Sequence, residues 1–175
     1  SLRVGGTTTF TADTGTAQDA VLTTANNHLV GKVTFDQTNS GSWRDVSLTT
    51  DTALNLGPLQ SGGTVLLDVQ GALTTDSNMS VSNNLTVTTH GGALALGSTT
   101  VSGAVALDTG IRDVHGVATG GGAVTQTGQL VVTGNTTVDA GTGAITLLNA
   151  ANVFGQSTTP GSPSTLSLIG SNTQV

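Results

Sequence analysis

The sequence predicts an all-β fold, a β-helix (solenoid) with coils of about 20 residues each. Three observations predict it. Short apolar strands alternate with polar corner residues, apolar positions return at a spacing close to 20, and one stretch of the chain closely repeats another. The composition agrees, because the 175 residues include 25 Gly and 34 Thr but only 8% charged and 2% aromatic residues.

The composition also excludes several other classes of protein. Long helices need Glu, Lys and Arg on their exposed faces, yet all ten acidic residues are Asp and only four residues are basic (Arg3, Lys32, Arg44 and Arg112). The hydrophobic fraction of 35% argues against a disordered chain. A net charge of −6 with scattered basic residues argues against nucleic-acid binding, and no apolar run approaches the ~18 residues of a membrane span.

The strands are predicted wherever two apolar residues flank a single residue, because one face of a half-buried strand has a period of two. Gly, Asn and Asp clusters between these pairs, such as Gly62–Gly63 and Gly141–Gly143, predict tight corners. In chain order the pairs are Leu2/Val4, Val33/Phe35, Val46/Leu48, Leu54/Leu56, Val65/Leu67, Leu85/Val87, Leu94/Leu96, Val105/Leu107, Leu130/Val132, Ile145/Leu147 and Leu166/Leu168.

One set of apolar residues keeps a regular spacing and predicts how the coils stack. Its intervals are 24, 19, 20, 20, 19, 21 and 21 residues. Stacked coils lie about 4.8 Å apart, so roughly eight of them predict a rod on the order of 40 Å long, with Val and Leu inward and Thr outward. Asn residues at the corners (26, 27, 83, 84, 149 and 152) are candidates for side-chain ladders. The set is Leu22, Val46, Val65, Leu85, Val105, Val124, Ile145 and Leu166.

The internal repeat is visible without gaps. Residues Leu2–Gly15 align on Leu130–Gly143 with eight of fourteen positions identical, and Ala20–Gly31 shares its ends and apolar spacing with Ala144–Gly155. Repetition of this kind is typical of a solenoid and rare in a globular enzyme.

Two segments depart from the regular coil. The longest interval contains Asn39–Asp45 and predicts an extra loop or a bulged corner; the tail from Gln156 to Ser164 contains Pro160 and is expected to leave the coil. The first segment also holds the only possible partner contact, Trp43 with Arg44, since exposed Trp and Arg are enriched at binding hot spots. The alternative is that Trp43 folds back over an apolar patch.

The densest polar cluster, Asp108–His115, offers a carboxylate pair, Arg112 and His115. A carbohydrate-cleaving β-helix needs converging carboxylates on one face, so Asp108 and Asp113 are the candidates for such chemistry. Because Asp beside Gly and Thr also serves turns, we expect a solvated corner and no catalytic site.

No cofactor or metal site is expected. His28, His90 and His115 lack the spacing of convergent ligands, there is no Cys, and no Gly-Lys-Ser/Thr follows Gly120–Gly122 to make a phosphate loop. Asn78, Asn84 and Asn135 fit the Asn-x-Ser/Thr pattern and are candidate glycosylation sites; the alternative is that the pattern arises by chance in a chain this rich in Asn, Ser and Thr.

The stretch from Gly122 to Gly155 resembles the repeat region of bacterial filamentous haemagglutinin-like adhesins, which are large exoproteins of the two-partner secretion type; Leu85–Gly97 resembles the same repeat. The resemblance implies a right-handed parallel β-helix, export through an outer-membrane transporter, and a location outside the cell or on the bacterial cell surface. Absence of Cys fits such export.

We therefore expect residues 1–175 to be a single β-helix segment of a larger repeat protein, because the chain opens without Met inside a repeat. The expected function is that of a non-enzymatic shaft, a rigid spacer in adhesion or an extracellular filament. Its expected partners are neighbouring coils of the parent chain or other subunits, host or cell-surface glycans or proteins, and the transporter. The alternatives are a carbohydrate-active β-helix enzyme and a self-stacking extracellular fibre subunit.

Overall fold

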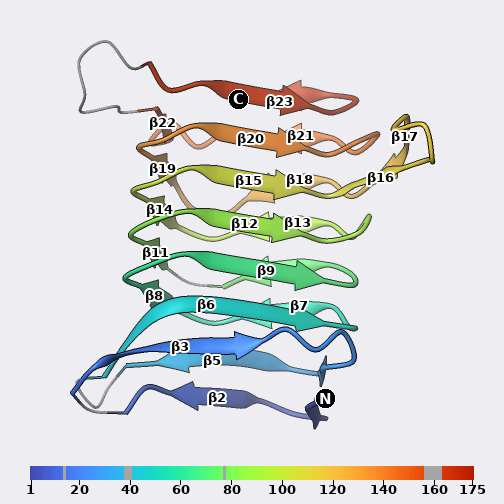
Figure 1. Ribbon diagram of the computed structural model, residues 1–175. Helices are drawn as coiled ribbons and strands as arrows, with labels where there is room; N and C mark the ends of the chain where they lie inside the picture. The colour runs from blue at the N-terminus through green and yellow to red at the C-terminus, as the bar shows by residue number, and fades with distance from the viewer. Residues whose placement is uncertain (14, 38–40, 77, 156–162) are drawn as a thin grey trace.

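The computed structural model describes residues 1–13, 15–37, 41–76, 78–155 and 163–175. This part of the chain is all-β and forms a solenoid of about seven turns of roughly 22 residues each. Figure 1 shows the strands stacked in rows along one axis, with the two termini at opposite ends. The predicted β-helix is confirmed, and its mean coil is slightly longer than predicted.

One side of the solenoid is an eight-stranded sheet in which every neighbouring pair is parallel. Its strands are β2 (Thr8–Thr11), β5 (Lys32–Asp36), β7 (Leu54–Leu56), β10 (Leu73–Thr75), β13 (Leu94–Leu96), β18 (Val124–Gln126), β21 (Ile145–Thr146) and β24 (Thr173–Gln174).

A twelve-stranded sheet forms the other two sides, because the long strand β6 (Ser42–Thr50) divides it into two columns. Trp43 pairs β6 with the first column, and the end of β6 pairs with the second. The first column continues through β8 (Leu59–Ser61), β11 (Met79–Val81), β14 (Thr99–Val101), β19 (Leu130–Val132) and β22 (Val153–Phe154). The second column contains β3 (Ala17–Leu22), then β9 (Val65–Val69), β12 (Leu85–Thr88), β15 (Val105–Asp108), β20 (Thr136–Asp139) and β23 (Leu166–Ile169).

Two small sheets complete the strand order. β1 (Arg3–Val4) pairs in parallel with β4 (His28–Leu29) at the N-terminal end. β16 (Gly110–Arg112) and β17 (Ala118–Gly121) form an antiparallel hairpin, which projects sideways from the stack in Figure 1.

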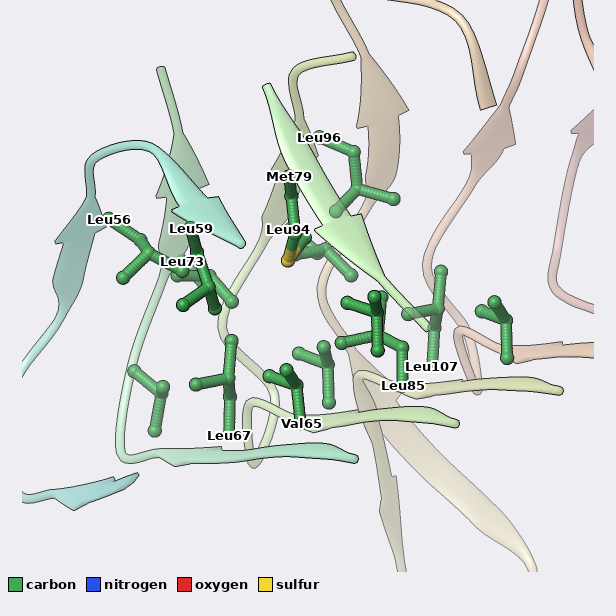
Figure 2. Packing of buried hydrophobic residues seen from close by; sticks show 14 of the residues in the cluster. Leu56, Leu59, Val65, Leu67, Leu73, Met79, Leu85, Leu94, Leu96 and Leu107 are labelled. Carbon is green, nitrogen blue, oxygen red and sulfur yellow. The ribbon is translucent and has the colours of Figure 1, made fainter. Parts of the chain in front are cut away.

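The core is one apolar column that fills the space between the three sides. Inward side chains such as Leu67, Leu85 and Leu107 are 0–1% exposed, and Figure 2 shows side chains from opposite strands pointing toward one another. Alternation explains the pattern: in β9 the side chains of Val65 and Leu67 are buried while that of Leu66 is exposed. Each coil therefore buries its apolar residues only because neighbouring coils cover them.

The predicted stacking register is right in the middle of the chain and wrong at both ends. Val46, Val65, Leu85 and Val105 stack as predicted. At the N-terminal end Ala20, rather than Leu22, pairs with Val46.

Beyond Val105 the predicted register crosses to another side of the solenoid. Val105 pairs with Thr136, which in turn pairs with Leu166, whereas Val124 and Ile145 belong to the eight-stranded sheet. The β16–β17 hairpin adds residues between β15 and β18, which are two sides of the same coil. Val124 of β18 therefore lies about one coil length after Val105 in the sequence, although it belongs to another side.

Threonine occupies more inward positions than predicted. Several buried Thr hydroxyls donate hydrogen bonds to corner carbonyls, including those of Thr50 to Asn27 (3.0 Å), Thr89 to Gly92 (2.5 Å) and Thr109 to Gly122 (2.6 Å). Each buried hydroxyl is thus satisfied by a corner carbonyl, and the carbonyl of Asn27 also accepts from the backbone N–H of Asp51 at 2.8 Å.

Corner Asn and Asp side chains bond to the backbone of the next coil rather than forming the predicted amide ladder. The backbone N–H groups of Ala104 and Thr165 donate to the side-chain oxygens of Asn84 (2.9 Å) and Asn135 (3.0 Å). The N–H of Thr64 donates likewise to Asp45 (2.7 Å). Each such bond ties one coil to the next at the corner that precedes the second column.

The internal repeat has a structural counterpart in two equivalent asparagines. The side-chain oxygens of Asn27 and Asn152 accept from the N–H groups of Leu2 and Leu130, both at 2.9 Å. Their amides donate to the carbonyl five residues earlier, at 2.8 and 2.9 Å. The aligned strands nevertheless occupy different sides, since β2 lies in the eight-stranded sheet and β20 in the second column. The sequence therefore repeats a strand-and-corner unit and not a position around the coil.

Replacing the buried clamp Asn27 should destabilise the protein. Asn27 is 3% exposed, and its amide also donates to the carbonyl of Thr49 at 3.2 Å. Asn27→Ala leaves these backbone groups without their partner and should lower the free energy of unfolding by about 1–3 kcal/mol. Its neighbour Asn26 is exposed, so Asn26→Ala should change it by less than about 0.5 kcal/mol. If urea unfolding showed the same loss of unfolding free energy for Asn27→Ala and Asn26→Ala, the stabilising role of Asn27 would be contradicted.

Candidate functional site: the Arg44 corner and the hairpin

The predicted contact pair of Trp43 and Arg44 separates in the structure. Trp43 is only 6% exposed and packs edge-to-face against Phe35 at 5.6 Å, and Phe35 stacks on Phe10 at 5.2 Å. The indole therefore belongs to the core of the first coils. The chain has only four aromatic residues, three Phe and one Trp, and three of them, Phe10, Phe35 and Trp43, pack together here. Residues 39 and 40 of the predicted excursion lie outside the described residues.

Arg44 remains at the surface and joins two coils. Its guanidinium donates hydrogen bonds to both carboxylate oxygens of Asp19, at 2.8 Å from Nε, and lies 3.8 Å from Asp45. It also lines a surface hollow of about 300 Å³ with Gln60 and Ser80. Hydrogen bonding from Arg44 lowers the pKa of Asp19 below its ordinary value of 3.8, and the same pair raises the pKa of Arg44.

The Asp19–Arg44 pair should stabilise the protein in a pH-dependent way. The folded-state pKa of Asp19 is lowered, so its contribution is present above the unfolded pKa and is lost as the pH falls through the folded pKa. Arg44→Gln should therefore destabilise the chain slightly near neutral pH and not at a pH well below 3.8. The control is Arg3→Gln, at another exposed arginine. A loss of stability that stays constant over this range would show that the Asp19 charge is not involved.

The hairpin corner brings together a different carboxylate pair from the predicted one. Asp113 lies beyond β16, where its carboxylate accepts from the N–H groups of His115 and Val117, both at 2.9 Å. Asp108 instead pairs in register with Asp139 of the next coil. Stacked strands are about 4.8 Å apart, so these two carboxylates share one side within ~10 Å.

Arg112 extends from the hairpin to this pair. It donates to the carboxylate of Asp139 and, at 3.2 Å, to the carbonyl of Gly116. The N–H groups of Gly110 and Gly141 donate to Asp108 and Asp139, both at 2.9 Å. Both carboxylates thus cap turns, the role expected for Asp beside Gly.

Three further pairs of side chains also join different coils. His28 lies 2.8 Å from Asp51, and His90 lies 2.6 Å from Asp68. The ammonium of Lys32 lies 3.1 Å from Asp76, which is two coils away. Over the described residues no group of three or more His and Asp side chains is arranged to hold a metal ion.

Asn78, Asn84 and Asn135, the possible glycosylation sites, are all exposed. The described part of the chain has no helix long and apolar enough to span a membrane.

Comparison with known proteins identifies a family of repeats. Residues 1–36 and 82–160 match the model of a family described as repeats of unknown function (DUF5649). Neither the curated proteins nor the solved structures contain a match. The two matched segments include the two aligned copies that begin at Leu2 and Leu130, with their equivalent clamps Asn27 and Asn152. The matched residues cover more than half of the chain, which therefore belongs to this family of repeats.

Proposed function

We propose that the chain is a non-enzymatic shaft segment that acts as a rigid spacer in a longer exoprotein. The observation that supports it is the continuity of the stack: three columns of parallel strands run along the axis, and one apolar core fills them. Backbone hydrogen bonds along the axis, together with ion pairs between coils, make such a rod stiff.

The finer identification is a shaft of a filamentous haemagglutinin-like adhesin of the two-partner secretion type. It is supported by the resemblance of Gly122–Gly155, which spans β18 to β22. On this proposal the protein is secreted or displayed on the bacterial cell surface, and an outer-membrane transporter exports it. Its other partners are adjoining coils and host or cell-surface glycans or proteins.

The shaft function is tested by changing the length of the rod without changing its surface chemistry. Residues 65–84 make one complete coil, because Val65 and Leu85 stack in register. The coil-deletion variant, which lacks residues 65–84, should keep the adhesion of the parent exoprotein. Deletion of residues 65–74 removes half a coil, brings the wrong sides together and should abolish folding. Loss of adhesion in a folded coil-deletion variant would overturn the spacer role.

The proposed location is tested by labelling intact cells. The chain has no native Cys, so Val21→Cys on a 68% exposed position of β3 introduces a single accessible thiol. A membrane-impermeant maleimide should label it on intact cells, and Val65→Cys, which is 0% exposed, should stay unlabelled. Labelling of Val21→Cys only after lysis would contradict surface display.

The stacked pair Asp108 and Asp139 is the one observation that favours a carbohydrate-active enzyme instead. That alternative requires the purified chain to release reducing or unsaturated ends from a polysaccharide, and Asp108→Asn to abolish the release. We expect no release from either form.

The self-stacking alternative is favoured by apolar exposure on the last coil, where Leu166 and Ile169 are 41% and 47% exposed. It requires light scattering to show particles that lengthen with protein concentration. A strictly monomeric solution would exclude it.

A further inference from the structure

The β16–β17 hairpin is an addition to a corner that closes without it. In the preceding coil, Thr89 and Gly92 close a tight turn through a backbone bond of 2.9 Å and a Thr hydroxyl bond of 2.5 Å. Thr109 and Gly122 make the same two bonds, at 3.0 and 2.6 Å, with the hairpin between them. The coil therefore gains nothing in closure from residues 110–121.

The hairpin is nevertheless held firmly. Its turn is fixed by the carboxylate of Asp113, which accepts from two backbone N–H groups, and by Gly116, whose φ is +77°. Arg112 ties it to Asp139 in the coil above. On the other side Ile111 lies against Gly91 of the coil below, where an added Cβ would be 2.5 Å from its Cδ1 atom. A loop fixed in this way loses little conformational entropy when it binds.

The turn displays apolar side chains that the core does not use. Val114 is 96% exposed and Val117 is 60% exposed. Together with the 46% exposed Ile111, they gather three of the large exposed apolar side chains into one short segment. Burial of these methyl groups would be favourable only against another molecule.

The surroundings of the hairpin are acidic. Asp108 and Asp113 form no ion pair with any Lys, Arg or His in the described part of the chain, and Arg112 is neutralised by Asp139. We propose that the hairpin is a recognition element that inserts Val114 and Val117 into an apolar pocket, rimmed by basic residues, on a partner protein. The apolar tip supplies the anchor, and the aspartates select the rim by charge.

The same charges disfavour other partners. A nucleic acid or an anionic bilayer would be repelled by Asp108 and Asp113, because the one arginine of the hairpin is already paired with Asp139 and its only other basic residue is His115. A protein with a basic rim around an apolar pocket is therefore the partner that both the apolar side chains and the carboxylates of the hairpin favour.

The first experiment places a photo-crosslinking benzoylphenylalanine at residue 114, with the same group at Val21, 68% exposed on β3, as the matched control. Each of the two labelled proteins is irradiated with an extract of the cells that produce the protein. In a separate reaction it is irradiated with an extract of the cells to which the producing cells attach. Only the test with the second extract depends on the proposed role in adhesion, because it assumes that the producing cells attach to other cells. A protein joined to residue 114 and not to residue 21 is expected. No such adduct in either extract, or an adduct with a second copy of this chain, would overturn the proposal.

The second experiment measures the affinity of the purified adduct protein for the intact chain. Val114→Ser should weaken it about ten-fold or more, and Val21→Ser should leave it unchanged. Replacement of residues 110–121 by His-Gly, the two residues between Thr89 and Gly92, should abolish binding while keeping the fold. Asp108→Asn should reduce the salt dependence of binding.

Two results would contradict the proposal at this stage. One is unchanged affinity in the hairpin replacement. The other is binding of the wild-type chain, lost in Val114→Ser, to vesicles of phosphatidylcholine with phosphatidylglycerol, which would assign the tip to a bilayer instead.

Discussion

Leu67→Ala should lower the free energy of unfolding by about 2–5 kcal/mol, because it removes the centre of a buried stack. Leu67 is 0% exposed and pairs with Leu48 in the coil below and Val87 in the coil above. Figure 2 shows its side chain directed into the core. Neighbouring coils are bonded to one another through three columns of strands, so the backbone has little freedom to collapse into the cavity.

The adjacent residue provides the control for this change. Leu66 lies on the same strand but is 40% exposed on the outer surface. Leu66→Ala removes the same atoms and should cost less than about 1 kcal/mol in urea unfolding. Comparable losses for the two variants would mean that the alternation along β9 is wrong.

Gly122→Ala should destabilise the protein by more than about 2 kcal/mol or prevent folding, because the corner has no room for a methyl group. A Cβ on Gly122 would lie 2.1 Å from the carbonyl oxygen of Gly92 in the coil below. The same close approach recurs along the axis, since a Cβ on Gly92 would lie 2.1 Å from the carbonyl carbon of Gly71 and one on Gly143 would lie 2.3 Å from the oxygen of Gly122. These contacts involve backbone atoms, which cannot move aside without breaking the ladder.

Gly6→Ala is the matched control, because a Cβ on Gly6 would meet nothing within 4 Å. Thermal unfolding by circular dichroism should show a large decrease in melting temperature for Gly122→Ala and little change for Gly6→Ala. A Gly122→Ala protein as stable as the parent would show that the coils are further apart at this corner than the structure places them.

The strands and the coil period could be predicted from the sequence, because apolar alternation and Gly-rich corners are local signals. The register could not be followed beyond Val105. The hairpin lengthens the step from Val105 to its partner Thr136, while Val124 on another side falls 19 residues after Val105 and imitates a coil. An insertion close to half a coil in length shifts a strand of another side into the expected spacing, so the spacing of apolar residues alone does not reveal it.

Side-chain placement at the candidate sites was harder to predict. Trp43 could not be assigned to core or surface because its contacts are with Phe35, from a different segment of the chain. The pairing of Asp108 with Asp139 had a readable signal: both are the fourth residue of strands that stack, as is Asp68 in β9. The Arg112–Asp139 pair had no such signal, since it depends on the direction in which the hairpin projects.

The most direct test of the rod is the distance between its two ends. Val21 and Ser167 lie in one outward row of the second column, six strand spacings apart. Spin labels on cysteines at these positions should give a narrow distribution near 29 Å by electron–electron double resonance, at about 4.8 Å a spacing. The coil-deletion variant should shorten this distance by about 4.8 Å. A broad distribution, or a distance that does not change with the coil removed, would contradict a rigid parallel solenoid.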